Sequence, residues 1–148
     1  EAEALGHRFS GNAVLDVLAG DIRPAMVAAL DRLLGTGFRL GCITNNIRGL
    51  RGPGMARSDA AANDYAAVFA RFEHIIESAA VGVRKPDPRI FELMCETMAL
   101  PPSACVFLDD IGVNCKGAAS IGMHAIKVGN ADAALLELGD LLGLDLAG

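Results

Sequence analysis

Polar residues of distinct chemistry follow three short apolar runs in this chain. Thr44 and Asn45 close the first run, and Lys85 stands in a Lys-Pro loop shortly after the second. Asp109 and Asp110 end the third. Hydroxyl and ammonium groups bind phosphate oxygens, and carboxylates bind hard cations such as Mg²⁺. Brought together, these side chains would form the electrostatic part of a phosphoryl-transfer site that lacks a nucleophile.

Each of these residues also has an ordinary structural interpretation. A Thr-Asn pair after a strand commonly forms a turn or a helix cap, and Asp109-Asp110 is able to cap the helix that follows. Lys85 would then be an exposed loop lysine. The ordered set at three successive strand ends is more specific than any one member, so the chemical interpretation is favoured.

The elements that would position these residues alternate along the chain. Apolar runs at 38–43, 74–77, 104–108 and 124–128 predict strands. Helical spacing predicts helices between them, including 59–72, and a terminal helix at 132–142. This alternation is typical of an α/β fold with a parallel sheet covered by helices on both faces. The carboxyl ends of parallel strands share one edge, so the polar residues are expected to converge there.

Composition limits the classes of protein that remain. The chain has 148 residues, 52% of them hydrophobic, which suits one domain. A net charge of -5 with scattered basic residues argues against nucleic acid as a partner. No apolar run approaches the ~20 residues that span a bilayer. Four cysteines without CxxC spacing predict free buried thiols and a cytoplasmic location.

The basic loop at 47–58 has two interpretations. Arg48, Arg51 and Arg57 could contact a substrate, or the loop could be exposed and solvated. The abundance of Gly and Arg favours the solvated loop.

Three segments together resemble a known superfamily. CITNN, VGVRKPDPRIF and FLDDIGVNCKGA followed by GM are similar to the second, third and fourth motifs of the haloacid-dehalogenase (HAD) superfamily of phosphohydrolases. The similarity is strongest to the phosphatase-like N-terminal domain of soluble epoxide hydrolases, and it covers roughly residues 22–142. It implies a Rossmann-like core, Mg²⁺ as cofactor, and hydrolysis of a small phosphate ester through an aspartyl-phosphate.

The resemblance also implies roles for individual residues. Thr44 and Asn45 would contact the phosphate, and Lys85 would steady the phosphate and the nucleophile. Asp110 would be the Mg²⁺ ligand. Asp109 is expected to be catalytic, and Asn114 to support the site.

The first motif of the family has no counterpart in the sequence. In the family it is an apolar strand followed by Asp-x-Asp, which supplies the nucleophile and lies between the strands that end in Thr44 and Asp109. We therefore expect residues 21–148 to be the C-terminal part of a HAD-like core, and residues 1–20 to be the end of a helical cap or linker. Open strand edges would favour a homo-oligomer or association with the missing N-terminal segment.

Two classes of function remain open. The first is a Mg²⁺-dependent phosphatase, with dehalogenase or phosphomutase chemistry as variants; as a fragment, this chain alone would be inactive. The second is a catalytically silent module that keeps the fold for binding or assembly. A receiver-like signalling domain is less favoured, because there the acidic strand comes first.

Overall fold

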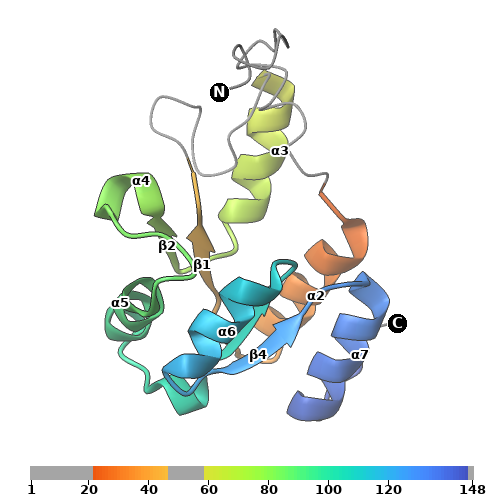
Figure 1. Ribbon diagram of the computed structural model, residues 1–148. Helices are drawn as coiled ribbons and strands as arrows, with labels where there is room; N and C mark the ends of the chain where they lie inside the picture. Colours follow the sequence, from red (N-terminus) through yellow and green to blue (C-terminus); the bar gives the residue numbers. More distant parts are fainter. Residues whose placement is uncertain (1–21, 47–58, 147–148) are drawn as a thin grey trace, which may run out of the picture.

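The computed structural model describes residues 22–46 and 59–146, and the structural statements below concern those residues (Figure 1). The elements, in chain order, are α2 (Pro24–Gly35), β1 (Gly41–Thr44), α3 (Asp59–Phe69), β2 (His74–Glu77), α4 (Ser78–Val81), α5 (Pro88–Met98), the 3₁₀ turn η2 (Pro102–Ala104), β3 (Val106–Asp109), α6 (Gly112–Ser120), β4 (His124–Lys127) and α7 (Ala131–Leu142).

The strands form two separate parallel pairs. β1 pairs with β2, so that Thr44 lies opposite Glu77. β3 pairs with β4, so that Asp109 lies opposite Lys127. Within the described part of the chain no strand hydrogen bonds join one pair to the other. Each pair is parallel, so Thr44 and Asp109 both lie at carboxyl ends.

Helices cover two opposite faces of the β3–β4 pair. Along β3, Phe107 packs into a core formed mainly by α5 and α6, whereas its neighbours Val106 and Leu108 pack into a second core formed by α2 and α7. Successive side chains of a strand point to opposite faces, so the two cores lie on either side of β3. Figure 1 shows α2 and α7 side by side, away from α5. The result is a helix, strand, helix arrangement.

The sequence of α5 explains why this segment forms a helix and packs against β3. Asp87 caps it by accepting a hydrogen bond from the Arg89 amide at 2.9 Å, and Pro88 occupies the first helical position. Five buried side chains repeat at helical spacing: Ile90, Phe91, Met94, Cys95 and Met98. Phe91 meets Phe107 edge to face at 5.0 Å between ring centroids, which fixes α5 against β3.

The predicted elements are present, with shifted ends. The strand expected at 38–43 is β1, at Gly41–Thr44, and the one expected at 104–108 is β3, at Val106–Asp109. The helix expected at 59–72 ends at Phe69, and α4 was not predicted. The expectations for residues 1–20 and for the loop at 47–58 lie outside the described residues. No helix in the described ranges is long and apolar enough to cross a membrane.

Candidate functional site

The two strand pairs are connected at their carboxyl ends by an ion pair. Lys85 Nζ donates to Asp109 Oδ2 at 2.7 Å, and the two side chains are only 12% and 6% exposed. Lys85 Nζ also lies 5.6 Å from the centroid of the Phe107 ring. The structure therefore brings together two residues that the strand order predicted would converge.

Asp109 is held from several sides. Its Oδ1 accepts from the Ile111 amide at 2.8 Å and from Asn114 Nδ2 at 3.0 Å, while Oδ2 accepts from Lys85. Asn114 is buried in the first turn of α6. Both oxygens of Asp109 thus have partners, and the side chain is placed to orient Lys85.

Asp110 has a different environment from its neighbour. It is exposed, and its carboxylate makes no hydrogen bond or ion pair with another described residue. No group of three or more His, Cys, Asp or Glu side chains that could hold a metal is present among the described residues. Mg²⁺ is commonly bound by one or two carboxylates together with substrate phosphate and water. Asp110 fits one such ligand position.

Asn45 follows β1 and contacts the loop that carries Lys85. Its Oδ1 accepts from the Lys85 amide at 2.9 Å, and its Nδ2 donates to the Lys85 carbonyl at 3.0 Å. Thr44, the last residue of β1, is partly buried. The end of β1 is thus tied directly to the Lys85 loop.

Burial and charge shift the pKa of two cysteines near the site. Burial raises the pKa of the Cys42 thiol to about 11, although the Lys85 ammonium acts in the opposite direction. The pKa of Cys115 is also raised, by burial and then by the charge of Asp109. All four cysteines are free. Neither of these two thiols has the lowered pKa of a nucleophilic cysteine.

Sequence reasoning did not find two features that support the site. Asn46 accepts from the Ala79 amide through Oδ1 at 3.1 Å and donates to Glu77 through Nδ2, so it anchors α4. Gly117 lies where α6 meets the Lys85 loop: a Cβ there would stand 2.3 Å from the Pro86 carbonyl oxygen. The small residues along α6 were visible in the sequence and could have pointed to this close approach.

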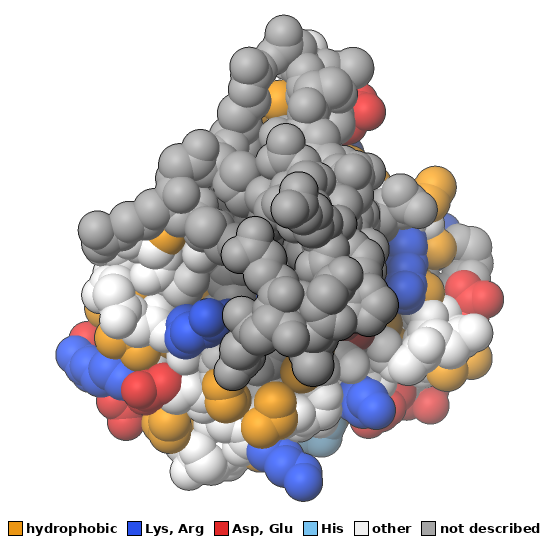
Figure 2. Space-filling model, turned by 45° about the horizontal axis from the view of Figure 1, so that its top comes forward, with side chains coloured by type: hydrophobic (Ala, Val, Ile, Leu, Met, Phe, Trp, Pro, Cys, Tyr) orange, Lys and Arg blue, Asp and Glu red, His pale blue; other side chains and the backbone are white. Residues whose placement is uncertain are grey.

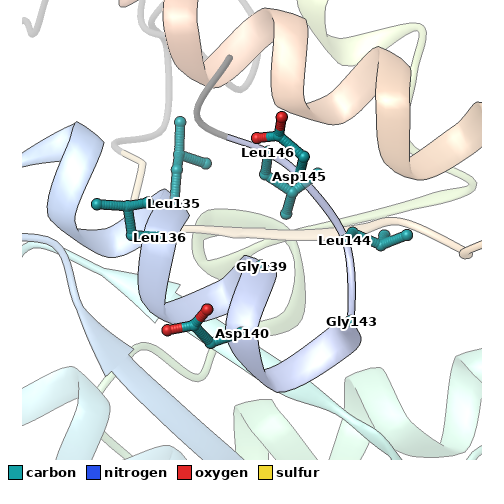
Figure 3. A pocket seen from close by; sticks show the side chains of 8 residues that line it. All are labelled: Leu135, Leu136, Gly139, Asp140, Gly143, Leu144, Asp145 and Leu146. Atoms are coloured by element: carbon teal, nitrogen blue, oxygen red, sulfur yellow. The ribbon is translucent and has the colours of Figure 1, made fainter.

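A hollow elsewhere on the molecule has different chemistry. It has a volume of about 360 Å³ and lies between α7 and the residues that follow it, lined by leucines, glycines, Asp140 and Asp145 (Figure 3). Its lining contains no cation to attract a phosphate. On the face in Figure 2, Lys and Arg side chains of the described residues stand apart from one another and do not gather into one patch.

The strands are parallel and flanked by helices, and a part-buried lysine and two carboxylates lie at their carboxyl ends. This arrangement defines an α/β protein of the kind that binds ligands beyond its strand ends. A family model described as haloacid dehalogenase-like hydrolase matches residues 2–122. The chain belongs to this family of hydrolases.

Relatives and solved structures agree with this assignment. The chain is 37% identical over 121 residues to bifunctional epoxide hydrolase 2 of Mus musculus, covering 82% of this chain and 21% of the mouse protein. It is 31% identical over 108 residues to phosphatase MT3486 of Mycobacterium tuberculosis, covering 73% of this chain and 45% of that one. The chain therefore spans less than half the length of either relative.

The fold also matches a HAD family enzyme of Bacteroides thetaiotaomicron, solved in complex with magnesium and inorganic phosphate. The TM-score is 0.58 at 19% identity, and the match covers 85% of this chain and 65% of the other.

Proposed function

We propose that this chain carries the phosphate and cation site of a Mg²⁺-dependent phosphatase that acts on a small phosphate ester. The observation that carries the proposal is the largely buried Lys85–Asp109 ion pair at the strand ends, with the exposed carboxylate of Asp110 next to Asp109 in the chain. The phosphatase among the relatives supports the reaction class.

The chemistry assigned to these residues is electrostatic. Negative charge redistributes over the phosphate oxygens in the transition state. The Lys85 ammonium, which Asp109 orients, offsets this charge. The Thr44 hydroxyl at the end of β1 donates a hydrogen bond to the same group. Asn114 keeps Asp109 in place through the 3.0 Å hydrogen bond to Oδ1.

Asp110 is the residue we assign to the cation. A bound Mg²⁺ would neutralise phosphate charge and orient the ester. The relative in complex with magnesium and inorganic phosphate supports this choice of metal. Asp110 supplies one oxygen ligand, and the remaining ligands would come from phosphate, water and a further carboxylate.

Hydrolysis through an aspartyl-phosphate also needs a carboxylate nucleophile. Both Asp109 oxygens already have partners, so Asp109 is unsuited to that role. We assign the nucleophile to an Asp-x-Asp on a further strand between β1 and β3. Among the described strands β1 pairs only with β2 and β3 only with β4, which supports this position, since a central strand would pair with both β1 and β3.

A second candidate function is a catalytically silent module that uses the same fold for binding. Asp109 has partners on both oxygens, and we assign Asp110 to the cation, so neither carboxylate is left to act as the nucleophile; this favours the module. The sequence upstream of the chain separates the two candidates: an apolar strand followed by Asp-x-Asp supports the enzyme, and substituted carboxylates support the module. The cytoplasmic location expected from the cysteines stays a prediction.

The experiment is a turnover assay on the intact protein with para-nitrophenyl phosphate and a panel of small phosphate monoesters, with Mg²⁺ or with EDTA. We expect Mg²⁺-dependent release of phosphate, reduced by at least about 100-fold in Lys85→Ala and in Asp110→Asn. The matched control is Lys116→Ala, which removes an exposed lysine on α6. No turnover of any ester with Mg²⁺, or equal activity in Lys85→Ala and the control, would overturn the proposal.

A further inference from the structure

The loop that carries Lys85 is held on two sides by groups that do not contact its ammonium. On one side, the Asn45 amide bonds to both backbone groups of Lys85, at 2.9 and 3.0 Å. On the other side, the backbone of α6 at Gly117 approaches the next residue of the loop, Pro86. The two contacts come from segments 72 residues apart in the chain.

The first contact fixes the position of the Lys85 backbone relative to β1. A side-chain amide that accepts from an N–H and donates to the C=O of the same residue imitates the pairing of a neighbouring strand. It sets both the distance and the orientation of the Lys85 backbone at the end of β1. The Lys85 side chain is thus fixed at both ends. Asn45 holds its backbone, and Asp109, at the end of β3, binds its ammonium.

The second contact requires the absence of a side chain. A Cβ at position 117 would stand 2.3 Å from the Pro86 carbonyl oxygen and 2.9 Å from Phe91 Cε2. Real Cβ atoms do not approach backbone this closely, so any larger residue would force the Lys85-Pro86 loop or α6 to move. Gly117 therefore allows α6 to pack directly against the backbone of the loop at Pro86, next to the residue that Asn45 holds.

We propose that Asn45 and Gly117 are positioning residues that together clamp the Lys85 loop and so place the ammonium on Asp109. The inference deepens the proposed function, on which its catalytic meaning rests, and it gives the Asn45 side chain a role other than direct contact with phosphate. The chain offers a matched control for each residue. Asn46 is the adjacent asparagine and anchors α4, and Gly112 lies in the same helix with only an ordinary contact, 3.6 Å from Lys127 Cδ.

The test measures how readily Lys85 is acylated, which does not depend on activity. The intact protein is treated briefly with an N-hydroxysuccinimide ester of acetate, and peptide mass spectrometry compares Lys85 with the exposed Lys116 and Lys127 as internal references. We expect both variants to raise the relative rate at Lys85 by about tenfold: Asn45→Ala removes the two hydrogen bonds that hold the loop, and Gly117→Ala adds a Cβ that displaces the loop from α6. Asn46→Ala and Gly112→Ala should leave the rate at Lys85 within about twofold of the unsubstituted protein.

The outcomes separate this inference from the proposed function. An unchanged Lys85 rate in both Asn45→Ala and Gly117→Ala, or an equal increase in the two controls, overturns the clamp. If the clamp variants show the increase and the protein hydrolyses esters, kcat should fall by about tenfold with a smaller change in KM. If the increase appears in a protein that hydrolyses no ester, the clamp stands and the phosphatase proposal fails. Should Asn45→Ala not fold, Asn45→Ser keeps one donor and one acceptor and gives the same comparison with a smaller increase.

Discussion

At the scale of single residues, Asp109 and Asp110 are adjacent in the chain but differ in burial and partners. Asp109 is buried, and its oxygens accept from Lys85, Ile111 and Asn114. Asp110 is exposed. In the proposed function the first carboxylate orients Lys85 and the second binds the cation, so the two should respond differently to substitution.

Removal of either carboxylate tests that difference through stability. Asp109→Ala leaves the Lys85 ammonium buried without its partner and should lower the free energy of unfolding by about 3 kcal/mol. Asp110→Ala removes an exposed side chain and should change it by less than about 0.5 kcal/mol. Urea unfolding in EDTA measures the free energy of unfolding of each variant. Equal losses in the two variants would contradict the difference in environment.

Cys42 gives a prediction for pH. Burial raises the pKa of its thiol from 9.0 to about 11 in the folded protein, so the unfolded chain ionises first as pH rises. The stability that the neutral thiol contributes is complete below pH 9 and is lost as pH increases toward 11. The rate of Cys42 alkylation by iodoacetamide, followed by mass spectrometry, should rise with a midpoint near pH 11. A midpoint at or below pH 9.0, the ordinary pKa of a thiol, would contradict the raised pKa of Cys42.

The sequence predicted the convergence at the site and named Asn114 as a supporting residue, but it did not predict the contacts that hold the Lys85 loop. Lys85 and Asp109 could be placed together because strand order alone brings carboxyl ends to one edge. The Asn45 bonds to the Lys85 backbone join residues 40 positions apart and leave no periodic pattern to read. The contact at Gly117 depends on how closely α6 packs, which spacing along one helix does not determine.

At the scale of elements, the strands and long helices followed from periodicity, whereas their ends depended on local contacts. β3 includes Asp109 because its carbonyl accepts from the Val128 amide at 2.9 Å, which continues the pairing with β4. Ala104 belongs to the η2 turn that Pro101 and Pro102 introduce, so it precedes the strand. Helix α4 has four residues, too few to show a helical repeat.

Helix α7 allows a direct test of a local end. Asn130 caps it by accepting a hydrogen bond from the Ala133 amide at 3.0 Å. Asn130→Ala should lower the free energy of unfolding by about 1 kcal/mol, because one amide of the first turn loses its partner. Asn130→Asp keeps the acceptor oxygen and serves as the control in the same denaturant titration. An aspartate variant as unstable as the alanine variant would mean that the cap bond is not what stabilises this end.

At the scale of the whole molecule, both parallel pairs contribute to the core that α5 and α6 cover, and among the described residues no strand pairing joins the two pairs. The sequence led us to expect open strand edges where the first-motif strand of the family lies. β1 and β3 are only partly buried for most of their length, unlike central strands with helices on both faces. Among the described residues β1 pairs only with β2 and β3 only with β4, which is the arrangement expected if a further strand lies between them.

Hydrogen exchange on the intact protein tests whether a strand occupies that position. If a strand lies between β1 and β3, it would bond to the β1 amides that do not bond to β2 and to the β3 amides that do not bond to β4. These amides should then exchange as slowly as the amides within the β1–β2 and β3–β4 pairs. The amides of β2 and β4 within their pairs provide the internal standard. Rapid exchange at the outward edges of β1 and β3 would show that these edges remain open.

A crystal structure of the intact protein grown with Mg²⁺ and inorganic phosphate would show directly whether Lys85, Thr44 and Asp110 bind these ligands. We expect phosphate oxygens within about 3 Å of Lys85 Nζ and of the Thr44 hydroxyl, and the cation coordinated by the Asp110 carboxylate. Phosphate bound away from Lys85, or a cation that leaves Asp110 uncoordinated, would contradict it.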